Sequence, residues 1–208
     1  MEQKHLLGCM KSVLDGTEHK YSFSKSLDIP EEYSYEPYMA PIVNQVGNTC
    51  VCNSTISILD WKLNMKDGTY DFNGFDPNEI YSIRSNKFED CGMTFKEALS
   101  YAKNHGVKYN KGIYKIGHYA MVTNKEMLKS ALIENGPCLF AVPVYNDNYE
   151  DFWIGRGKLQ GGHAMCFVGY NKDGFILRNS WGETYGENGY ALLPYSDFDN
   201  VWEIWTVF

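Results

Sequence analysis

The sequence contains no apolar stretch of about 18 residues, the length that a membrane-spanning helix requires. It has no run of lysine or arginine, and its formal net charge is −7. These two features disfavour nucleic acids and anionic membranes as partners. CxxC and HExxH motifs are also missing, so the sequence predicts no metal site. We therefore expect a chain that needs no cofactor, nucleic acid or membrane.

The first residues include no apolar segment of signal-peptide length and no clear cleavage site, which predicts a cytoplasmic protein. The alternative is a secreted protein whose leader has already been removed. Six cysteines could form disulfides, but 208 residues are enough to bury a core without them. We therefore expect free thiols. Cys50 and Cys52 would point apart on a helix and would not pair with each other.

The composition is that of an ordinary globular protein, with 44% hydrophobic and 22% charged residues. Apolar spacing and capping residues predict helices over residues 50–64, 76–85, 94–104 and 124–135, with Thr49, Asp76, Thr94 and Asn124 as their caps. Runs rich in β-formers then predict strands over residues 138–144, 164–170, 175–178, 189–193 and 201–207. Helices followed by strands favour an α+β fold, in which a helical lobe packs against an antiparallel β lobe. A groove between two such lobes is a natural ligand site.

Residues 1–28 are polar and weakly patterned, and we interpret them as an N-terminal arm or a short pro-segment. A short helix is expected over residues 1–14. The segment from residue 29 to residue 37 should be extended, because Pro30 and Pro37 break helices. The arm could block the site, dock a partner or form part of the fold.

Three residues could perform nucleophilic chemistry together. Cys50 stands where the first helix should begin, and a helix N-terminus lowers the pKa of a thiol. His163 follows two glycines at the mouth of a strand, so its backbone can approach another lobe closely. Asn179 closes the next strand, where its amide could fix the tautomer of an imidazole. A two-residue turn would not bring Asn179 opposite His163, so a bulge or a longer loop must shift the register. Taken alone, Cys50 would be interpreted first as a buried structural cysteine, because buried cysteine is a common small hydrophobic residue.

Several sequence blocks, in order over residues 29–207, resemble the papain-like cysteine peptidases and, near the chain end, their compact bacterial and viral branch. The blocks are Pro41-Ile42-Val43-Asn44-Gln45 followed by Cys50, the segment 92–99 followed by Gly106-Val107, Gly162-His163-Ala164, Asn179-Ser180-Trp181-Gly182, Gly186-Glu187-Asn188-Gly189-Tyr190 and Leu193-Pro194-Tyr195. The resemblance implies a two-lobe peptidase domain over residues 29–208. Its helical lobe would cover residues 29–135, and a β-barrel-like lobe would cover residues 136–208.

The resemblance implies a role for each matched position. Cys50 would be the nucleophile, His163 its base and acid, Asn179 the group that orients His163, and Gln45 the oxyanion donor. Trp181 would shield the bond between His163 and Asn179. The substrate-binding set would comprise Gly92, Met93, Phe95, Gly162, Ala164 and Trp181, and it favours a small or apolar substrate side chain.

This sequence departs from the family pattern around the nucleophile. Gly47 replaces the usual cysteine, Val51 replaces the aromatic residue, and the spacing from Gln45 to Cys50 is one residue short. Cys52 is therefore an alternative nucleophile, although Cys50 keeps Ser54 and the apolar helix positions in the family's register.

The resemblance implies a cysteine endopeptidase that forms a thioester acyl-enzyme and acts as a monomer on protein or peptide substrates. Two other functions are possible on the same groove. One is another acyl transfer, such as peptide ligation, deamidation or removal of a protein modifier. The other is peptide binding without catalysis.

Overall fold

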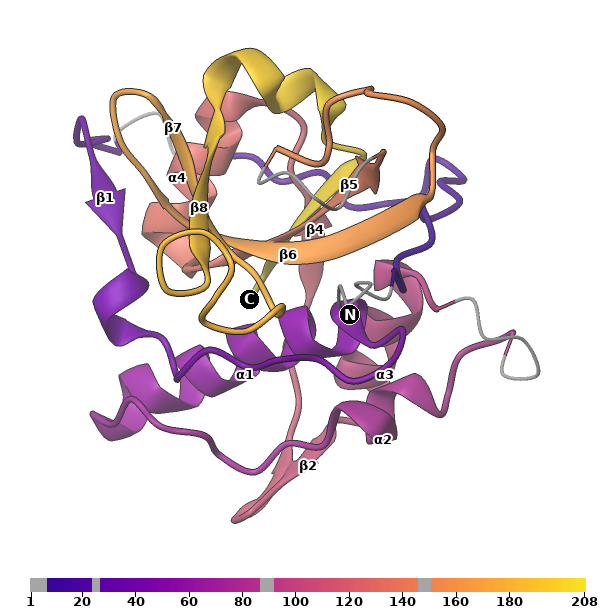
Figure 1. The fold of residues 1–208 in the computed structure, drawn as a ribbon. Coiled ribbons are helices and arrows are strands. Elements are labelled where there is room, and N and C mark those ends of the chain that lie inside the picture. Colours follow the sequence, from indigo (N-terminus) through magenta and orange to yellow (C-terminus); the bar gives the residue numbers. More distant parts are fainter. Residues whose placement is uncertain (1–6, 24–26, 87–91, 146–150) are drawn as a thin grey trace.

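One antiparallel sheet separates two hydrophobic cores. The computed structural model describes residues 7–23, 27–86, 92–145 and 151–208. Helix α1 lies on one side of the sheet and α4 on the other (Figure 1). The described helices are η1 (Glu36–Tyr38), α1 (Cys50–Asp67), α2 (Pro77–Tyr81), α3 (Phe95–Asn104), α4 (Lys125–Asn135) and η2 (Tyr195–Asn200).

The main sheet has seven strands, and six of them run in the spatial order β4-β9-β5-β6-β7-β8 while β1 pairs with β6. All pairings are antiparallel. The bounds are β1 (Tyr33–Ser34), β4 (Tyr119–Met121), β5 (Cys138–Val144), β6 (Gly161–Tyr170), β7 (Gly174–Arg178), β8 (Tyr190–Pro194) and β9 (Glu203–Val207), and β2 (Val107–Tyr109) with β3 (Gly112–Tyr114) forms a separate hairpin. The predicted α+β fold is confirmed. The sheet does not close into a barrel, because its outer strands β4 and β8 are not paired with each other among the described residues.

Two hydrophobic clusters pack on opposite faces of this sheet. One joins α1 and α3 to inward-facing residues of β5, β6 and β9. The other joins α4 to the opposite side chains of the same strands, and its stacked pair Phe140 and Phe167 has ring centroids 3.6 Å apart. Helix α4 and strand β4 therefore pack with the sheet, although both precede residue 136. No helix in the described part of the chain is long and apolar enough to cross a membrane.

Helix caps follow the sequence closely, with one exception. The helices expected over residues 50–64, 94–104 and 124–135 are confirmed, and the one expected over residues 76–85 ends early, at Tyr81. Asp76, Thr94 and Asn124 cap their helices through their side chains. Thr49 stands at the N-cap of α1, but its side chain makes no cap hydrogen bond. Its hydroxyl instead donates to the Val46 carbonyl at 2.8 Å, so the prediction of a Thr49 cap was wrong in its chemistry.

The expected helix over residues 1–14 is wrong where the structure describes it, because residues 7–14 form no helix. Their backbone hydrogen bonds go to segments far away in the sequence, through Cys9 to Gly162 and through Met10 to Met93. Residues 1–6 lie outside the described part. The chain near Pro37 also differs from the expected extended conformation, since Pro37 belongs to η1, where a proline is tolerated at the first turn.

The capping box of α3 fixes the position of the residues just before it. The Glu97 carboxylate accepts the Thr94 backbone N–H at 2.8 Å, and the Thr94 hydroxyl accepts the Glu97 N–H at 3.2 Å. Removing the threonine side chain leaves the Glu97 N–H without this acceptor. We expect Thr94→Ala to lower the free energy of unfolding by about 1 kcal/mol, measured by urea denaturation. Thr123→Ala, at an exposed threonine that caps no helix, should change it by less than about 0.5 kcal/mol. Equal losses in the two variants would contradict a capping role for Thr94.

Candidate active site

Cys50 is the first residue of α1, and the chain reaches it through a tight turn. Gly47 in that turn has φ of 68°, in the left-handed region that glycine adopts without strain. The backbone conformation at position 47 therefore favours glycine. The first N–H groups of α1 have no partner within the helix and point toward its N-terminal end. Cys50 itself is fully buried.

The start of β6 lies against the start of α1. The backbone N–H of Ala164 acts on the Cys50 sulfur and favours its thiolate form. His163, the residue before Ala164, is fully buried on the same strand. Strand β6 starts at Gly161, three residues earlier than expected, so His163 lies within the strand rather than at its mouth. The two segments, 113 residues apart in the sequence, thus bring the thiol and the imidazole into one site.

Asn179 fixes the tautomer of His163. Its Oδ1 lies 2.7 Å from His163 Nε2 and also accepts the backbone N–H of Ser180 at 2.7 Å. A backbone N–H can only donate, so the atom that faces it must be the amide oxygen. That oxygen in turn requires a hydrogen on His163 Nε2. The bulge expected between β6 and β7 is present, as a register shift between Phe167 and Gly169.

Two aromatic rings cover this hydrogen bond. Trp181 stacks on the His163 ring with centroids 4.3 Å apart and an interplanar angle of 25°. Phe152 packs against both, with its centroid 5.7 Å from His163 and 4.8 Å from Trp181. Both aromatic side chains are buried. A hydrogen bond in such a low-dielectric setting is stronger than one in water.

Gln45 is attached to the same loop as Asn179. Its backbone N–H donates to the Ser180 carbonyl at 2.7 Å, and its side-chain oxygen accepts the Ser180 hydroxyl at 2.7 Å. Its amide nitrogen donates to the Gly47 carbonyl at 3.1 Å. Ser180 therefore fixes the Gln45 amide with its nitrogen toward the turn that leads to Cys50.

Burial raises the pKa of the Cys50 thiol to about 11, although the backbone N–H groups of Ala164 and Gly8 favour the thiolate. The lowered pKa expected from the helix N-terminus is not found, because the loss of water outweighs it. The pKa of Cys52 is raised further by burial, and its sulfur lies 3.4 Å from the Met93 sulfur. Cys52 thus packs beside Met93, whereas Cys50 faces β6. The five described cysteines are free thiols, and Cys91 lies outside the described residues.

The N-terminal arm occupies the space between the two lobes beside Cys50. Cys9 N–H donates to the Gly162 carbonyl at 3.1 Å on the β side. On the helical side, Met10 N–H donates to the Met93 carbonyl and Met93 N–H donates to the Gly8 carbonyl, each at 3.0 Å. The bridge between Cys9 and Met93 is parallel. We call this space, bounded by Gly92 and Met93 on one wall and Gly162 on the other, the arm groove.

Glycine makes this close approach possible on all three segments. A Cβ on Gly8 would lie 1.9 Å from the Asn48 carbonyl oxygen. One on Gly92 would lie 2.1 Å from the Gly8 carbonyl oxygen, and one on Gly162 would lie 2.4 Å from the Cys9 carbonyl oxygen. Real Cβ atoms are not found at such distances, so the arm groove admits a polypeptide backbone only because both walls lack side chains here.

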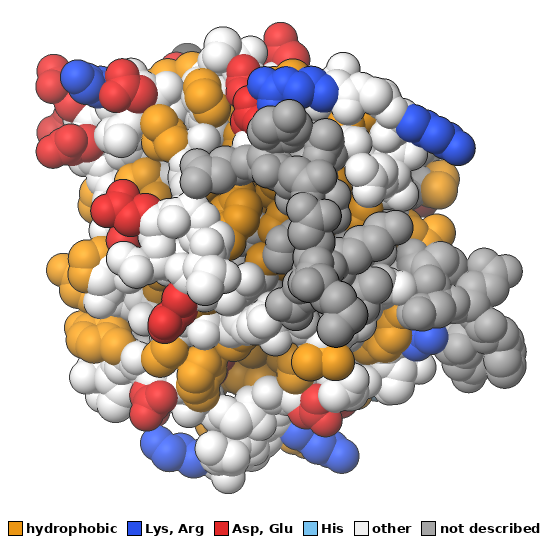
Figure 2. All heavy atoms as spheres, in the orientation of Figure 1, with side chains coloured by type: hydrophobic (Ala, Val, Ile, Leu, Met, Phe, Trp, Pro, Cys, Tyr) orange, Lys and Arg blue, Asp and Glu red, His pale blue; other side chains and the backbone are white. Residues whose placement is uncertain are grey.

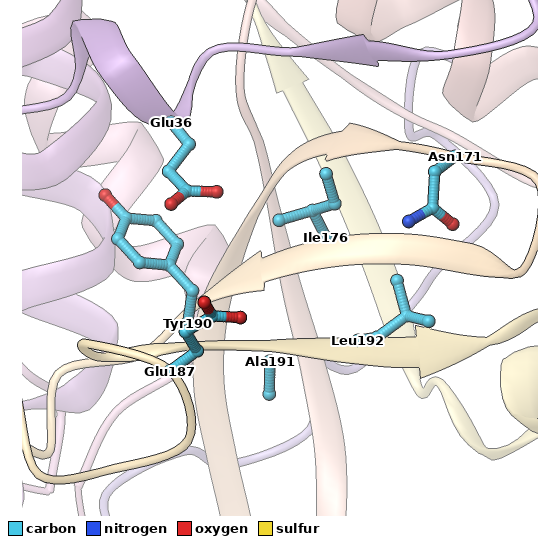
Figure 3. Close-up of a pocket in the computed structure, with 7 residues that line it drawn as sticks. All are labelled: Glu36, Asn171, Ile176, Glu187, Tyr190, Ala191 and Leu192. Atoms are coloured by element: carbon cyan, nitrogen blue, oxygen red, sulfur yellow. The ribbon is translucent and has the colours of Figure 1, made fainter.

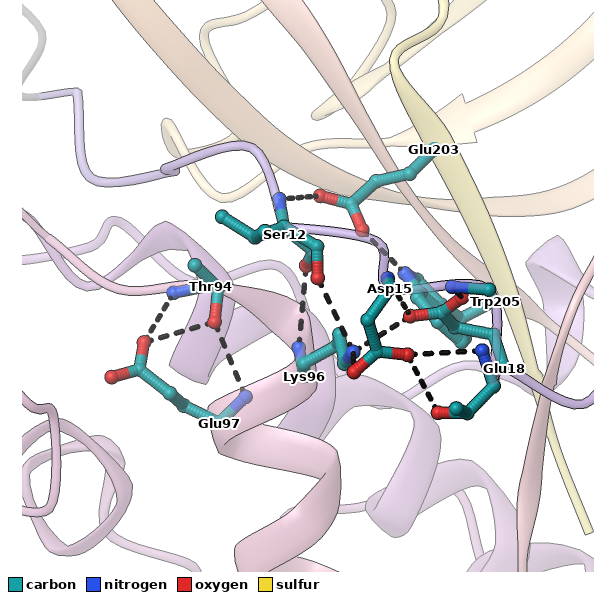
Figure 4. Close-up of polar contacts among 11 residues, drawn as sticks. Ser12, Asp15, Glu18, Thr94, Lys96, Glu97, Glu203 and Trp205 are labelled. Carbon is teal, nitrogen blue, oxygen red and sulfur yellow. Dashed lines mark hydrogen bonds and ion pairs between the residues drawn. The ribbon is translucent and has the colours of Figure 1, made fainter.

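Polar contacts hold the next part of the arm (Figure 4). The Ser12 N–H donates to Glu203 Oε1 at 2.9 Å, and Lys96 Nζ lies 2.7 Å from Glu18 and 3.7 Å from Asp15. A hydrogen bond from Thr17 lowers the pKa of the Asp15 carboxyl group. A hydrogen bond from Lys96 lowers the pKa of the Glu18 carboxyl group. Farther along, the arm pairs with β4 through His19 and Tyr21.

A second hollow, of about 380 Å³, lies elsewhere on the molecule, beside the outer strand β8 (Figure 3). Its lining residues are Glu36, Asn171, Ile176, Glu187, Tyr190, Ala191 and Leu192. None of them belongs to the predicted catalytic set. On the face shown in Figure 2, basic side chains lie apart from one another among acidic and hydrophobic ones.

The family model of the papain family cysteine proteases matches residues 69–201, which is more than half of the chain. The chain belongs to the papain family of cysteine proteases. The matched region includes His163 and Asn179 but neither Gln45 nor Cys50.

Individual relatives of this papain-family chain are distant. A gut-specific cysteine proteinase of Caenorhabditis elegans is 28% identical over 169 residues, which cover 73% of this chain and 49% of that protein. The chain thus spans about half the length of this relative. Xylellain, a cysteine protease from Xylella fastidiosa, superposes with a TM-score of 0.79 at 22% identity and covers 97% of this chain and 95% of its own. Procathepsin B S9 from Trypanosoma congolense gives 0.80 at 17% identity, covering 98% and 87%. These two structures share the fold.

Hydrogen bonds and ring contacts link His163, Asn179, Trp181 and Gln45, directly or through Ser180. The Ala164 N–H links this group to Cys50, and Gly92, Met93 and Gly162 bound the arm groove. Met93, Phe95 and Ala164 are fully buried in the core that underlies the arm groove. Sequence reasoning missed Phe152, the arm residues 8–10 and Glu203. Ser180 stood within the recognised Asn-Ser-Trp block, so its position beside Asn179 was the one available signal for its role.

The reactivity of Cys50 toward alkylation should follow its raised pKa. Only the thiolate reacts, so the rate with iodoacetamide should rise about tenfold per pH unit and approach a plateau near pH 11. Mass spectrometry of the peptide that contains Cys50, in the folded full chain, measures this rate. A plateau below pH 9 would show that the thiol is already ionised beneath the arm.

Proposed function

We propose that this chain is a cysteine endopeptidase that hydrolyses peptide bonds through a thioester acyl-enzyme. The observation that carries the proposal is the hydrogen bond from His163 Nε2 to Asn179, next to the strand whose Ala164 N–H acts on the Cys50 sulfur. Membership of the papain family supports it.

The tautomer of His163 defines the path of the proton. With Nε2 holding its hydrogen for Asn179, Nδ1 takes the proton of the Cys50 thiol, and the thiolate attacks the substrate carbonyl carbon. His163 then gives that proton to the leaving amine as the C–N bond breaks, which leaves a thioester on Cys50. A water molecule loses a proton to His163, attacks the thioester, and releases the acid and the thiol.

Two groups are suited to the negative oxygen that forms during each attack. The backbone N–H of Cys50 belongs to the first turn of α1 and has no acceptor in the helix. The Gln45 side-chain nitrogen points toward the same turn, held there by Ser180. Donors fixed before the reaction stabilise a developing oxyanion without reorganisation.

The arm indicates how a polypeptide would lie in the site. The arm backbone runs from Leu7, against Gly161, through the arm groove to Ser12. Because the chain continues at both ends, the groove suits cleavage within a polypeptide. We propose that a substrate uses the same backbone groups of Met93 and Gly162, and that the catalytic set, which comes from one chain, acts in a monomer.

We also propose that the arm keeps the enzyme latent. It fills the groove, and its Gly8 N–H acts on the Cys50 sulfur while the Gly8 carbonyl is bonded to Met93. The arm therefore presents an N–H to the nucleophile instead of a carbonyl carbon, so it blocks the site without being cut. The described thiols would remain free in a reducing compartment, and we propose a cytoplasmic location on that ground.

Replacing the nucleophile should abolish turnover. Cys50→Ala should lower hydrolysis of a peptide library by at least about 10⁴-fold, because no other group can form the thioester. Cys52→Ala, two residues along the same helix, should retain most of the activity. Mass spectrometry of the products measures both, and it would also detect joined peptides if an amine competes with water. Loss of activity in Cys52→Ala alone would assign the nucleophile to Cys52.

Displacing the arm should activate the enzyme. In Gly8→Val, the new Cβ overlaps the Asn48 carbonyl group. Overpacking of this kind costs about 1–3 kcal/mol. The fraction of molecules whose arm has left the groove, and with it kcat/KM, should therefore rise roughly five- to a hundredfold. Lys11→Val, at an exposed arm position, is the matched control and should leave activity unchanged. Trypsin cleavage after Lys11 in Gly8→Val reports whether the arm has left. A released arm without a gain in activity would contradict latency.

A further inference from the structure

Arg178 is a buried cation at the end of β7, immediately before Asn179 in the chain. Only 3% of this residue is exposed. In the part of the chain that the structure describes, no carboxylate lies within ion-pair distance of its guanidinium group. Removing a cation from water without such a partner is unfavourable, so its N–H groups need acceptors inside the molecule.

The guanidinium group of Arg178 donates to three separate segments. Nη2 donates to the Pro41 carbonyl at 2.6 Å, Nη1 to the Tyr190 hydroxyl at 3.0 Å, and Nε to the Ser57 hydroxyl at 3.5 Å. These acceptors belong to the segment that leads to Gln45, to β8 and to α1. A rigid planar guanidinium group suits acceptors on several sides, whereas the ammonium group of lysine presents all its donors from one nitrogen. Arg178 therefore links the sheet to α1 and to the Gln45 segment.

Asp60 of α1 balances this charge at longer range. Its side chain is buried, and its Oδ1 accepts the Asn73 backbone N–H at 2.8 Å. It stands one helical turn after Ser57, so both side chains lie on the same face of α1. Burial raises the pKa of the Asp60 carboxyl group, and the positive charge of Arg178 acts against that rise. The two opposite charges therefore act on each other between α1 and the sheet.

The segment 41–45 is held at both ends by the two residues that flank Asn179. Arg178, on one side of Asn179, binds the Pro41 carbonyl. Ser180, on the other side, binds the backbone and the side chain of Gln45. The position of the Gln45 amide nitrogen is therefore fixed relative to the asparagine that orients the imidazole.

We propose that Arg178 is a positioning residue, which holds the segment 41–45 so that the Gln45 amide stays at the oxyanion site. This inference rests on the proposed peptidase function. Through its bonds to Pro41 and Ser57, Arg178 sets the distance between this segment and α1, whose first residue, Cys50, supplies the other oxyanion donor. Because the oxyanion exists only during the reaction, misplacing one donor lowers kcat and leaves KM almost unchanged.

The test compares variants of the full chain in which Gly8→Val displaces the arm, with one quenched fluorescent peptide chosen from a library digest. Active sites are counted by titration with an irreversible peptidyl epoxide. Arg178→Lys keeps the positive charge near Asp60 but loses the planar donor group. Its kcat per active site should fall roughly ten- to a hundredfold, while KM should change less than about threefold. Tyr190→Phe removes one partner and leaves the bond to Pro41, so its kcat should stay within about threefold of the parent. An unchanged kcat in Arg178→Lys, or an equal loss in Tyr190→Phe, would overturn the proposal.

A double-mutant cycle with Gln45 separates positioning from a general contribution to the fold. Gln45→Ala removes the oxyanion donor itself, so in that background Arg178→Lys should lower kcat by less than about threefold. The same loss with and without Gln45 would contradict the proposal, because Arg178 would then act on something else. If circular dichroism shows that Arg178→Lys does not fold, Arg178→Gln, whose amide can still donate a hydrogen bond, is measured in the same cycle.

Hydrogen exchange separates this inference from the function on which it rests. In the full chain without substrate, a peptide that covers residues 41–49 should exchange roughly tenfold faster in Arg178→Lys than in the parent, whereas α4, on the other side of the sheet, should not change. That result together with no hydrolysis by Gly8→Val would keep the positioning role and remove the peptidase. Hydrolysis by Gly8→Val with additive losses in the cycle would keep the peptidase and remove the positioning role.

Discussion

The site depends on the contact between the first turn of α1 and the start of β6. The Ala164 N–H and the Cys50 sulfur meet there, and this contact joins the helical lobe to the sheet beside His163. Two features of the backbone position the groups around this contact. The turn at Gly47 leads the chain into α1, and the bulge near Gly169 turns β7 so that Asn179 reaches the imidazole.

Burial acts in two directions at this contact. Aromatic cover from Trp181 and Phe152 strengthens the hydrogen bond that orients His163, because it excludes competing water. The arm excludes water from the sulfur as well, and there the effect is to keep Cys50 as a neutral thiol. Orientation of the base and ionisation of the nucleophile are therefore controlled by different segments. The aromatic cover belongs to the fold, whereas the arm is attached by backbone hydrogen bonds and polar contacts that can be broken.

Local signals in the sequence were sufficient where local interactions decide the structure. The capping box of Thr94 and Glu97 needs only residues three apart, and the helix was predicted nearly to the residue. Thr49 failed as a cap because the nearby carbonyl of Val46 competes for its hydroxyl. The early start of β6 depends on its pairing with the end of β5, and the arm depends on partners more than 80 residues away, such as Met93 for Met10. Periodicity within a segment carries no information about either kind of partner.

The candidate site divides in the same way. His163 and Asn179 lie in a continuous, recognisable block, so their pairing could be predicted before any geometry was known. Glu203 could not be found like this, because an isolated glutamate in a C-terminal strand has no local signature. Its contact with the arm joins it to Ser12, a partner 191 residues away in the sequence.

The two glycine walls explain why recognition should depend on side-chain pockets. Gly92 and Gly162 admit any backbone, since they have no side chain and offer it only N–H and carbonyl groups, as their contacts with the arm show. Backbone contacts of this kind hold a polypeptide without distinguishing one sequence from another. Discrimination must then come from the places where side chains leave the extended chain.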